Sequence, residues 1–273
     1  MKKIMRKGPV FVLFLFLPLL LWSCAGTEGD NSASHTAVTH TAEPENLLKV
    51  GITTNYPPLV FKEDGRFRGV EIDLAKRLAR ELGRNVRAIN MPWEKQIPAL
   101  LQGKTDIIMS GMTVTAERTV RIAFTSPYLV TGLVAAIRNS DRELFTTVED
   151  LKERNISIGV IRNTVGERYV RQNFIKASRI VLFDKTDHAA VALTENKITA
   201  FIHDAPAVMW AVSRHEAEIC GLWESMKEEK IAWGVRKDNP ELLAKLNEII
   251  EKWRNDGTLD AIIAKWLPYQ LSK

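Results

Sequence analysis

The sequence predicts an α/β protein whose sheets are mostly parallel. Short apolar runs typical of strands alternate with helical segments of ordinary length between residues 47 and 270. This alternation occurs in two sets, the first to about residue 130 and the second to about residue 228. Polar loops follow the strands, and ligands of such sheets bind beyond the carboxyl ends of the strands. We therefore expect a binding site built from these loops.

The first set rests on local patterns. Apolar residues at helical spacing over 69–83, ending at Gly83, predict an amphipathic helix, and a second helix is capped by Gly103. The expected strands of this set cover 47–53, 85–91 and 105–111, with a short strand after "NYPP" and helices over 93–104 and from 115 to 124.

The second set continues the alternation, and two helices separated at Gly257 close the chain. Its expected strands cover 132–139, 156–163, 179–183 and 198–204, and its helices cover 146–155, 165–175, 187–197 and 205–215. A further strand is expected over 230–237.

The net charge of +5 does not indicate a nucleic-acid-binding protein. Four of the basic residues lie in residues 1–23, which carry no acid, and the remaining chain has 34 basic and 33 acidic side chains. No long basic run suggests a surface that binds phosphates. We therefore expect no nucleic-acid partner.

Residues 1–23 are predicted to be a signal peptide, because a basic start precedes a short apolar run. The following "LWSC" resembles the lipobox of bacterial lipoproteins, in which Cys24 is lipidated; an ordinary signal peptide with an incidental cysteine is the alternative. Residues 24–46 are polar and predict a flexible tether. Cys220, the other cysteine, is expected to be buried or half-buried, with no intramolecular disulfide.

The segment "SGMTVTAER" places small polar residues and an arginine after a strand. Arg118 in the first turn of a helix is unfavourable beside the helix dipole unless an anion offsets its charge. A carboxylate does so with bidentate geometry, assisted by the Thr113 hydroxyl and the small Gly111. The alternative is a surface arginine paired with Glu117 or solvated.

Four further residues have both a structural and a functional interpretation. Asp204 ends a strand and either caps the next helix or pairs with a ligand ammonium group. Tyr56 and Trp93 are either core aromatics or the walls of a ligand pocket. Glu167 lies in the first turn of a helix, where acids are favoured for dipole reasons alone. No motif demands catalysis, and no metal site or cofactor is expected.

Several of these segments, in order, resemble the bacterial extracellular solute-binding proteins of family 3, which bind polar amino acids. They include "NYPPLVF", "GVEIDLAKRLARELG", "SGMTVTAER", "NTVGERYV", "ITAFIHDAPAV" and "IAWGVRKDNPELL". The resemblance implies the type II periplasmic-binding-protein-like fold, with two α/β lobes joined by crossover strands near 129–132 and 228–232. Lobe 1 would comprise 47–130 plus 231–273, and lobe 2 would comprise 131–230.

The resemblance also implies a role for individual residues. Arg118 would hold the ligand's α-carboxylate with Thr113, Gly111 and the nearby Ser110, and Asp204 would take its α-ammonium. In addition, the backbone N–H of Val165 would reach the carboxylate, and Tyr56 and Trp93 would form the side-chain pocket.

Which amino acid is bound stays open. Many relatives carry an acid where Thr53 stands, so its absence disfavours lysine and arginine, while "IHDAP" resembles the glutamine binders. Ile161 replaces a residue that is polar in some glutamine binders, and Asn163 and Val165 depart from the usual Gly-Thr-Thr.

The resemblance implies amino-acid capture by hinge closure and delivery to an ABC transporter permease, rather than enzymatic activity. We expect a monomer anchored through its lipid to the membrane, on the periplasmic or extracellular face. The alternative is a cyclohexadienyl dehydratase-like enzyme on the same fold, with Glu167 as general acid. A membrane receptor's sensor module is disfavoured, because no spanning segment follows Leu267.

Overall fold

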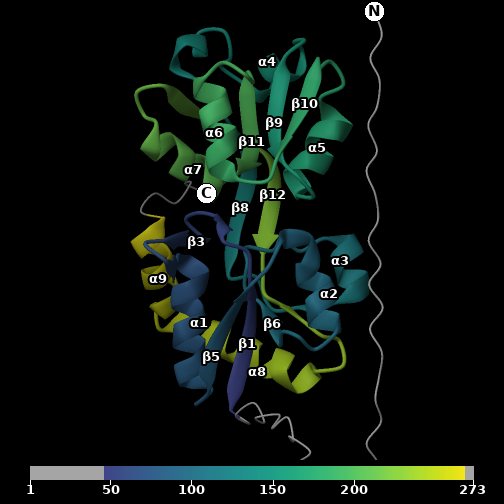
Figure 1. The fold of residues 1–273 in the computed structure, drawn as a ribbon, viewed down its shortest axis with the longest axis vertical. Coiled ribbons are helices and arrows are strands. Elements are labelled where there is room, and N and C mark those ends of the chain that lie inside the picture. The colour runs from purple at the N-terminus through teal and green to yellow at the C-terminus, as the bar shows by residue number, and fades with distance from the viewer. Residues whose placement is uncertain (1–45, 268–273) are drawn as a thin grey trace, which may run out of the picture. The chain divides into compact units, whose positions relative to one another are not determined.

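The computed structural model describes residues 46–267. The predicted signal peptide, the lipidation site at Cys24 and the tether up to residue 45 lie outside the described residues. Within the described part, two five-stranded sheets lie one in each lobe, with helices around them (Figure 1). No helix of this part is long and apolar enough to cross a membrane.

The first lobe is built on a sheet with the strand order β5-β1-β6-β13-β7. Strand β1 pairs in parallel with β5 and β6, while β13 is antiparallel to both β6 and β7. The strands are β1 (Leu47–Ile52), β5 (Asn85–Asn90), β6 (Ile107–Ile108), β7 (Ala123–Phe124) and β13 (Gly234–Val235). A small antiparallel sheet adds β2 (Asn55–Tyr56), β3 (Val60–Glu63) and β4 (Arg66–Arg68).

The second lobe has the strand order β10-β9-β11-β8-β12. Strand β9 pairs in parallel with β10 and β11, whereas β8 is antiparallel to both β11 and β12. The strands are β8 (Leu129–Arg138), β9 (Ser157–Ile161), β10 (Arg179–Phe183), β11 (Ala200–Asp204) and β12 (Ile219–Ile231). The α/β two-lobed fold is confirmed. Both sheets are mixed, because β13 adds antiparallel pairs to the first sheet and β8 adds them to the second.

Helices surround both sheets, largely where the sequence predicts them. Two of them begin at threonine N-caps: Thr115 caps α3, and Thr147 forms a capping box with Asp150 at α4. The helices of the described chain are α1 (Val70–Glu81), α2 (Gln96–Leu101), α3 (Ala116–Arg121), α4 (Val148–Lys152), α5 (Val165–Asn173), α6 (Thr186–Thr194), α7 (Ala205–Arg214), α8 (Pro240–Asn255) and α9 (Thr258–Trp266).

Strands β8 and β12 connect the two lobes (Figure 1). They pair with each other from Leu129 opposite Ile231 to Leu133 opposite Lys227, close to the predicted crossovers. The predicted single strand over 230–237 is wrong. The chain forms the end of β12, breaks at Ala232 and Trp233, and resumes as β13 in the other sheet. The exact lobe boundaries stay a prediction.

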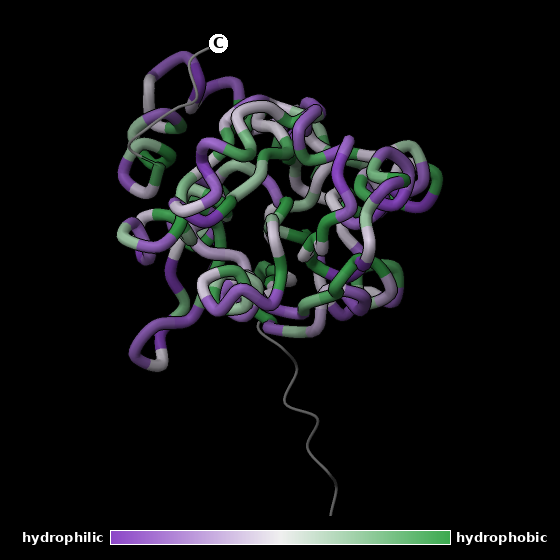
Figure 2. The backbone as a smooth tube through the Cα atoms, turned by 90° about the horizontal axis from the view of Figure 1, so that it is seen from above, coloured by the Kyte–Doolittle hydropathy of each residue, from purple (hydrophilic) through white to green (hydrophobic). Residues whose placement is uncertain are grey.

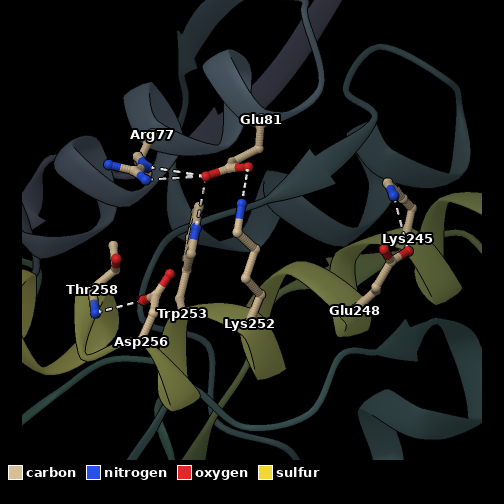
Figure 3. A network of polar contacts seen from close by, with 8 residues as sticks. All are labelled: Arg77, Glu81, Lys245, Glu248, Lys252, Trp253, Asp256 and Thr258. Atoms are coloured by element: carbon tan, nitrogen blue, oxygen red, sulfur yellow. Dashed lines mark hydrogen bonds and ion pairs between the residues drawn. The ribbon is translucent and has the colours of Figure 1, made fainter.

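The C-terminal helices pack against the first lobe. Glu81 of α1 accepts hydrogen bonds from Lys252 Nζ (2.8 Å) and Trp253 Nε1 (3.4 Å) of α8 (Figure 3). Asp73 of α1 accepts from Lys265 Nζ (2.6 Å) and Trp266 Nε1 (2.9 Å) of α9. These contacts hold α8 and α9 beside α1, so the chain returns to the lobe in which it began.

Apolar side chains fill the interior of each lobe. Hydrophobic segments lie mainly inside and hydrophilic ones mainly in the outer loops (Figure 2). The core of the first lobe includes Trp233 and Trp253, which are fully buried, and the cores of the second lobe cover both faces of its sheet. Cys220 is buried in the second lobe.

Glu71, a fully buried carboxylate, joins three segments beneath the site. It accepts hydrogen bonds from the backbone N–H of Gly111 (2.7 Å), the hydroxyl of Tyr128 (2.8 Å) and Nε1 of Trp233 (2.9 Å). Tyr128 precedes β8 and Trp233 follows β12, so one side chain contacts the first-lobe ends of both crossover strands. Burial raises the pKa of Glu71 to about 7, although its hydrogen bonds oppose the shift.

Glu71→Gln is expected to remove a pH dependence from the free energy of unfolding. Between its ordinary pKa of 4.5 and about 7, the folded protein retains a proton that the unfolded chain has released. The stability that this group contributes is therefore fully present below about pH 4.5 and falls by roughly 3 kcal/mol as the pH rises past 7.

Urea unfolding of the wild type and the variant at about pH 5 and about pH 8 measures this effect. The wild type should lose more stability than the variant over this interval. An equal loss in both proteins would contradict the assignment.

Candidate ligand-binding site

A cavity of about 510 Å³ is lined by residues of both lobes. The first lobe lines it from the loops after β1, β5 and β6, and the second lobe from the loops after β9, β10 and β11. These are carboxyl ends of parallel strands, as expected. All eight predicted ligand-binding residues line this cavity: Tyr56, Trp93, Ser110, Gly111, Thr113, Arg118, Val165 and Asp204.

Arg118 presents a buried guanidinium group to the cavity; the residue is 9% exposed. Its Nη1 donates to the Thr113 carbonyl (2.8 Å), and the guanidinium lies 5.1 Å from the centre of the Trp93 ring. No acidic side chain among residues 46–267 forms an ion pair with it, so the predicted alternative of pairing with Glu117 does not occur. Burial and the nearby Arg168 lower the pKa of Arg118 to about 10.

The polar groups beside Arg118 already have protein partners. The Ser110 hydroxyl accepts from the Thr53 backbone N–H (2.8 Å), and the Gly111 N–H donates to Glu71. Gly111 has a φ of 65°, and a Cβ there would lie 2.5 Å from the Tyr56 ring. Only glycine fits at position 111, because any side chain would collide with the Tyr56 ring. This contact could not be read from the sequence.

Asp204 faces the cavity from the end of β11 and is 5% exposed. It occupies the N-cap position of α7, but its side chain makes no capping hydrogen bond, so the capping alternative is wrong. Its carboxylate instead accepts a hydrogen bond from Tyr56 of the first lobe. The Tyr56 ring also stacks on His203, with centroids 5.1 Å apart. Tyr56 therefore links the lobes.

A second carboxyl group contacts Asp204 from behind the cavity wall. Glu229 of β12 is 1% exposed, and its Oε1 lies 3.4 Å from the Thr113 hydroxyl. Burial and the neighbouring Asp204 raise the pKa of Glu229 to about 10. Burial opposes ionisation of Asp204 too, but its interactions with His203, Glu229 and Tyr56 hold its pKa well below the usual value.

The loop before α5 contributes the second-lobe wall. Val165 is the first residue of α5, where backbone N–H groups lack helical partners. The preceding Asn163 has a φ of 60°, and its carbonyl accepts from Nε1 of Trp93 (3.1 Å). A further hydrogen bond joins the lobes: the side-chain amide of Asn55 donates to the Asp184 carbonyl (2.9 Å).

Glu167 does not line the cavity. Its carboxylate accepts from the Asn163 backbone N–H (2.7 Å) and from Nε of Arg171 (2.9 Å), and its backbone N–H donates to the Thr164 hydroxyl (3.3 Å). The Thr164 hydroxyl therefore caps α5, and the Glu167 carboxylate fixes the residue before the cap.

Glu71 and Glu229 are two residues that sequence reasoning missed. Glu71 shares a helical face with the buried Leu74, Ala75 and Leu78, and this spacing could have indicated its burial. Glu229 lies two residues before the buried Ile231, so strand periodicity directs it inward too. Its charged neighbours obscured this signal. No cluster of metal ligands is found between residues 46 and 267.

Comparisons with known proteins agree with this arrangement. The chain is 26% identical over 227 residues to the L-cystine-binding protein TcyJ of Escherichia coli (strain K12), covering 83% of this chain and 84% of that protein. It is 29% identical over 264 residues to the probable histidine-binding protein of Campylobacter jejuni, covering 96% and 99% of the two chains.

Among solved structures, the fold matches an ancestral amino acid-binding protein described as a precursor of cyclohexadienyl dehydratase. The TM-score is 0.74 at 32% identity, over 81% of this chain and 95% of that one. The family model for bacterial extracellular solute-binding proteins, family 3, matches residues 48–269. The chain therefore belongs to the bacterial extracellular solute-binding proteins of family 3.

Proposed function

We propose that the cavity binds a polar amino acid as a zwitterion, with its α-carboxylate on Arg118 and its α-ammonium on Asp204. The observation that carries this proposal is the pair of opposite charges lining one cavity, a guanidinium that lacks an ion-pair partner and an ionised carboxylate. Neither charge is neutralised by an ion pair with the other in the described part of the chain. A zwitterion satisfies both.

The carboxylate end would be held mainly by the guanidinium. Arg118 is fixed by its bond to the Thr113 carbonyl and by the Trp93 ring, which orients its planar donors before the ligand arrives. The Val165 backbone N–H would add a donor from the second lobe. The Thr113 hydroxyl proton is directed to Oε1 of Glu229 (3.4 Å), so Thr113 would contribute through its carbonyl, which fixes Arg118. The Ser110 hydroxyl oxygen accepts a hydrogen bond from the Thr53 N–H, and its proton can still be donated to the ligand.

The ligand would favour closure because it touches both lobes. Arg118 and Thr113 belong to the first lobe, and Asp204 and Val165 to the second. A ligand stabilises whichever state brings these groups together, and the crossover strands β8 and β12 are the elements about which the lobes would move. The closed form is then the one offered to an ABC transporter permease.

The relatives indicate a polar side chain without naming it, since one binds cystine and another is a probable histidine-binding protein. The side-chain end of the cavity offers the aromatic faces of Tyr56 and Trp93 together with polar lining groups. Thr53 stands where many relatives carry an acid, and this departure disfavours lysine and arginine. The Thr53 hydroxyl accepts from Gln96 and donates to the Met91 carbonyl, so it supplies no negative charge for a basic side chain.

The protein would act at the outer face of the membrane. The basic and apolar residues 1–23 followed by "LWSC" support export and a lipid on Cys24. A lipidated, monomeric binding protein would remain close to its permease.

Arg118→Ala should weaken amino-acid binding on the order of 100-fold or more, because it leaves the ligand carboxylate buried without its partner. Arg118→Lys should restore only part of the affinity, since an ammonium group cannot make the bidentate pair. A thermal-shift screen of the wild type against the twenty amino acids identifies the ligand, and calorimetry of the variants measures the loss.

The melting temperature of the ligand-free variants serves as the control for folding. Undiminished affinity in Arg118→Ala would refute the assignment of the carboxylate site.

Asp204→Asn preserves the size of the side chain and its acceptor for Tyr56 but removes the charge that would face the ammonium group. We expect affinity to fall on the order of 30-fold or more. Asp184→Asn, at an exposed carboxylate that also lines the cavity, is the matched control and should stay within about threefold of the wild type. Equal losses in the two variants would contradict the proposed ammonium site.

Glu167→Gln should leave amino-acid affinity within about threefold of the wild type and cost about 1 kcal/mol of stability, because the carboxylate serves the start of α5. The wild type should not consume prephenate or arogenate. Consumption by the wild type that is lost in Glu167→Gln would establish the dehydratase-like alternative and overturn the binding-only interpretation.

A further inference from the structure

Glu229 is a buried titratable residue that lies outside the cavity lining and has no place in the proposed ligand contacts. It extends from the crossover strand β12 between Thr113 of the first lobe and Asp204 of the second. Its Oε1 lies 3.4 Å from the Thr113 hydroxyl, and its carboxyl group contacts that of Asp204. Among the described residues, no N–H or O–H donor reaches its buried Oε2.

Two adjacent buried carboxyl groups cannot both ionise at low cost, so the pair shares one proton. Asp204 accepts a hydrogen bond from Tyr56, whereas Glu229 has only the long contact from Thr113. Nδ1 of His203 accepts the Asp204 backbone N–H (2.7 Å) and so donates nothing to either carboxyl group. The negative charge is therefore better stabilised on Asp204, and the proton resides on Glu229.

The charged groups around Glu229 agree with this assignment. Lys227 on the same strand favours ionisation of Glu229, but burial and the charge on Asp204 outweigh it and raise the pKa of Glu229. Arg118 of α3 is electrostatically coupled to both carboxyl groups and so does not distinguish between them.

We propose that Glu229 is a positioning residue whose neutral carboxyl group donates a hydrogen bond to Asp204 and accepts one from Thr113, holding Asp204 for the ligand's ammonium group. This role rests on the proposed function, because Asp204 needs positioning only if it binds that group. The chain Thr113–Glu229–Asp204 runs from the carboxylate end of the cavity to its ammonium end and from one lobe to the other.

The charge balance of the cavity explains why a neutral Glu229 favours ligand binding. Arg118 and Asp204 carry one charge each, which matches a zwitterion. An ionised Glu229 would leave one uncompensated negative charge buried beside the ligand, at a large desolvation cost. Its proton therefore keeps the site selective for a ligand with a single ammonium at this end.

The test compares two substitutions of similar size, with L-glutamine, L-histidine and L-arginine as probes. Glu229→Gln retains a donor for Asp204 and an acceptor for Thr113, and its affinity should stay within about threefold of the wild type. Glu229→Met removes both and should bind about tenfold or more weakly, the typical effect of a lost hydrogen bond to a charged group. The ligand-free melting temperature of Glu229→Met should not fall, since an apolar side chain replaces a buried polar one.

Two measurements report the proton directly. Calorimetry in two buffers of different ionisation enthalpy at about pH 7.5 should show no net proton release on binding by either the wild type or Glu229→Gln. Infrared difference spectra of the two ligand-free proteins should contain the stretch of a protonated carboxyl group in the wild type only.

The outcomes separate the claims. A tenfold loss in Glu229→Gln or no protonated carboxyl band would overturn the neutral form of Glu229, and release of about one proton by the wild type alone would overturn it for the ligand complex. Unchanged affinity in Glu229→Met would overturn the positioning role alone. Wild-type protein that binds none of the three probes in calorimetry, nor any amino acid in the thermal-shift screen, would overturn the proposed function and the positioning role with it, while the infrared result still decides where the proton lies.

Discussion

The buried carboxylate of Glu71 is the contact on which the geometry of the site most depends. It accepts from Gly111 in the loop that carries Ser110 and Thr113, from Tyr128 before β8 and from Trp233 after β12. A buried carboxylate without donors would be costly, so these three segments are held to one point. The loop that precedes Arg118 and both crossover strands are thereby fixed relative to the first lobe, and Tyr56 packs directly on Gly111.

The cavity above this point is organised by charge. Arg118 is buried against Trp93 with no carboxylate partner in the described chain, while Asp204 is ionised and bonded to Tyr56 across the lobes. Glu229 adds a carboxyl group whose pKa is raised by burial and by Asp204, so the pair as a whole carries one charge. The charges in the cavity are thus set to receive a molecule with one positive and one negative end, and they belong to different lobes.

The sequence predicted the fold well where periodicity and capping residues decide the structure. Thr115 and Gly257 stand at the helix boundaries where they were expected, and all eight predicted ligand-binding residues line one cavity. The sequence-based prediction failed where contacts between distant parts of the chain determine the structure. The long strand β12 contains a charged run, and its pairing with β8 rather than its own composition makes it a strand. The partners of Glu71 lie 40 to 162 positions away and the Thr113 partner of Glu229 lies 116 positions away, so local spacing could indicate that these side chains face inward but not what they contact.

The central claim is that the ligand must carry both an α-carboxylate and an α-ammonium group to join the two lobes. Calorimetry with the amino acid that gives the largest thermal shift, with its α-carboxamide and with its N-acetyl derivative tests this most directly. The account predicts that each derivative binds on the order of 100-fold or more weakly than the parent, because each leaves one buried charge without its partner. Binding of either derivative at the affinity of the parent would contradict it.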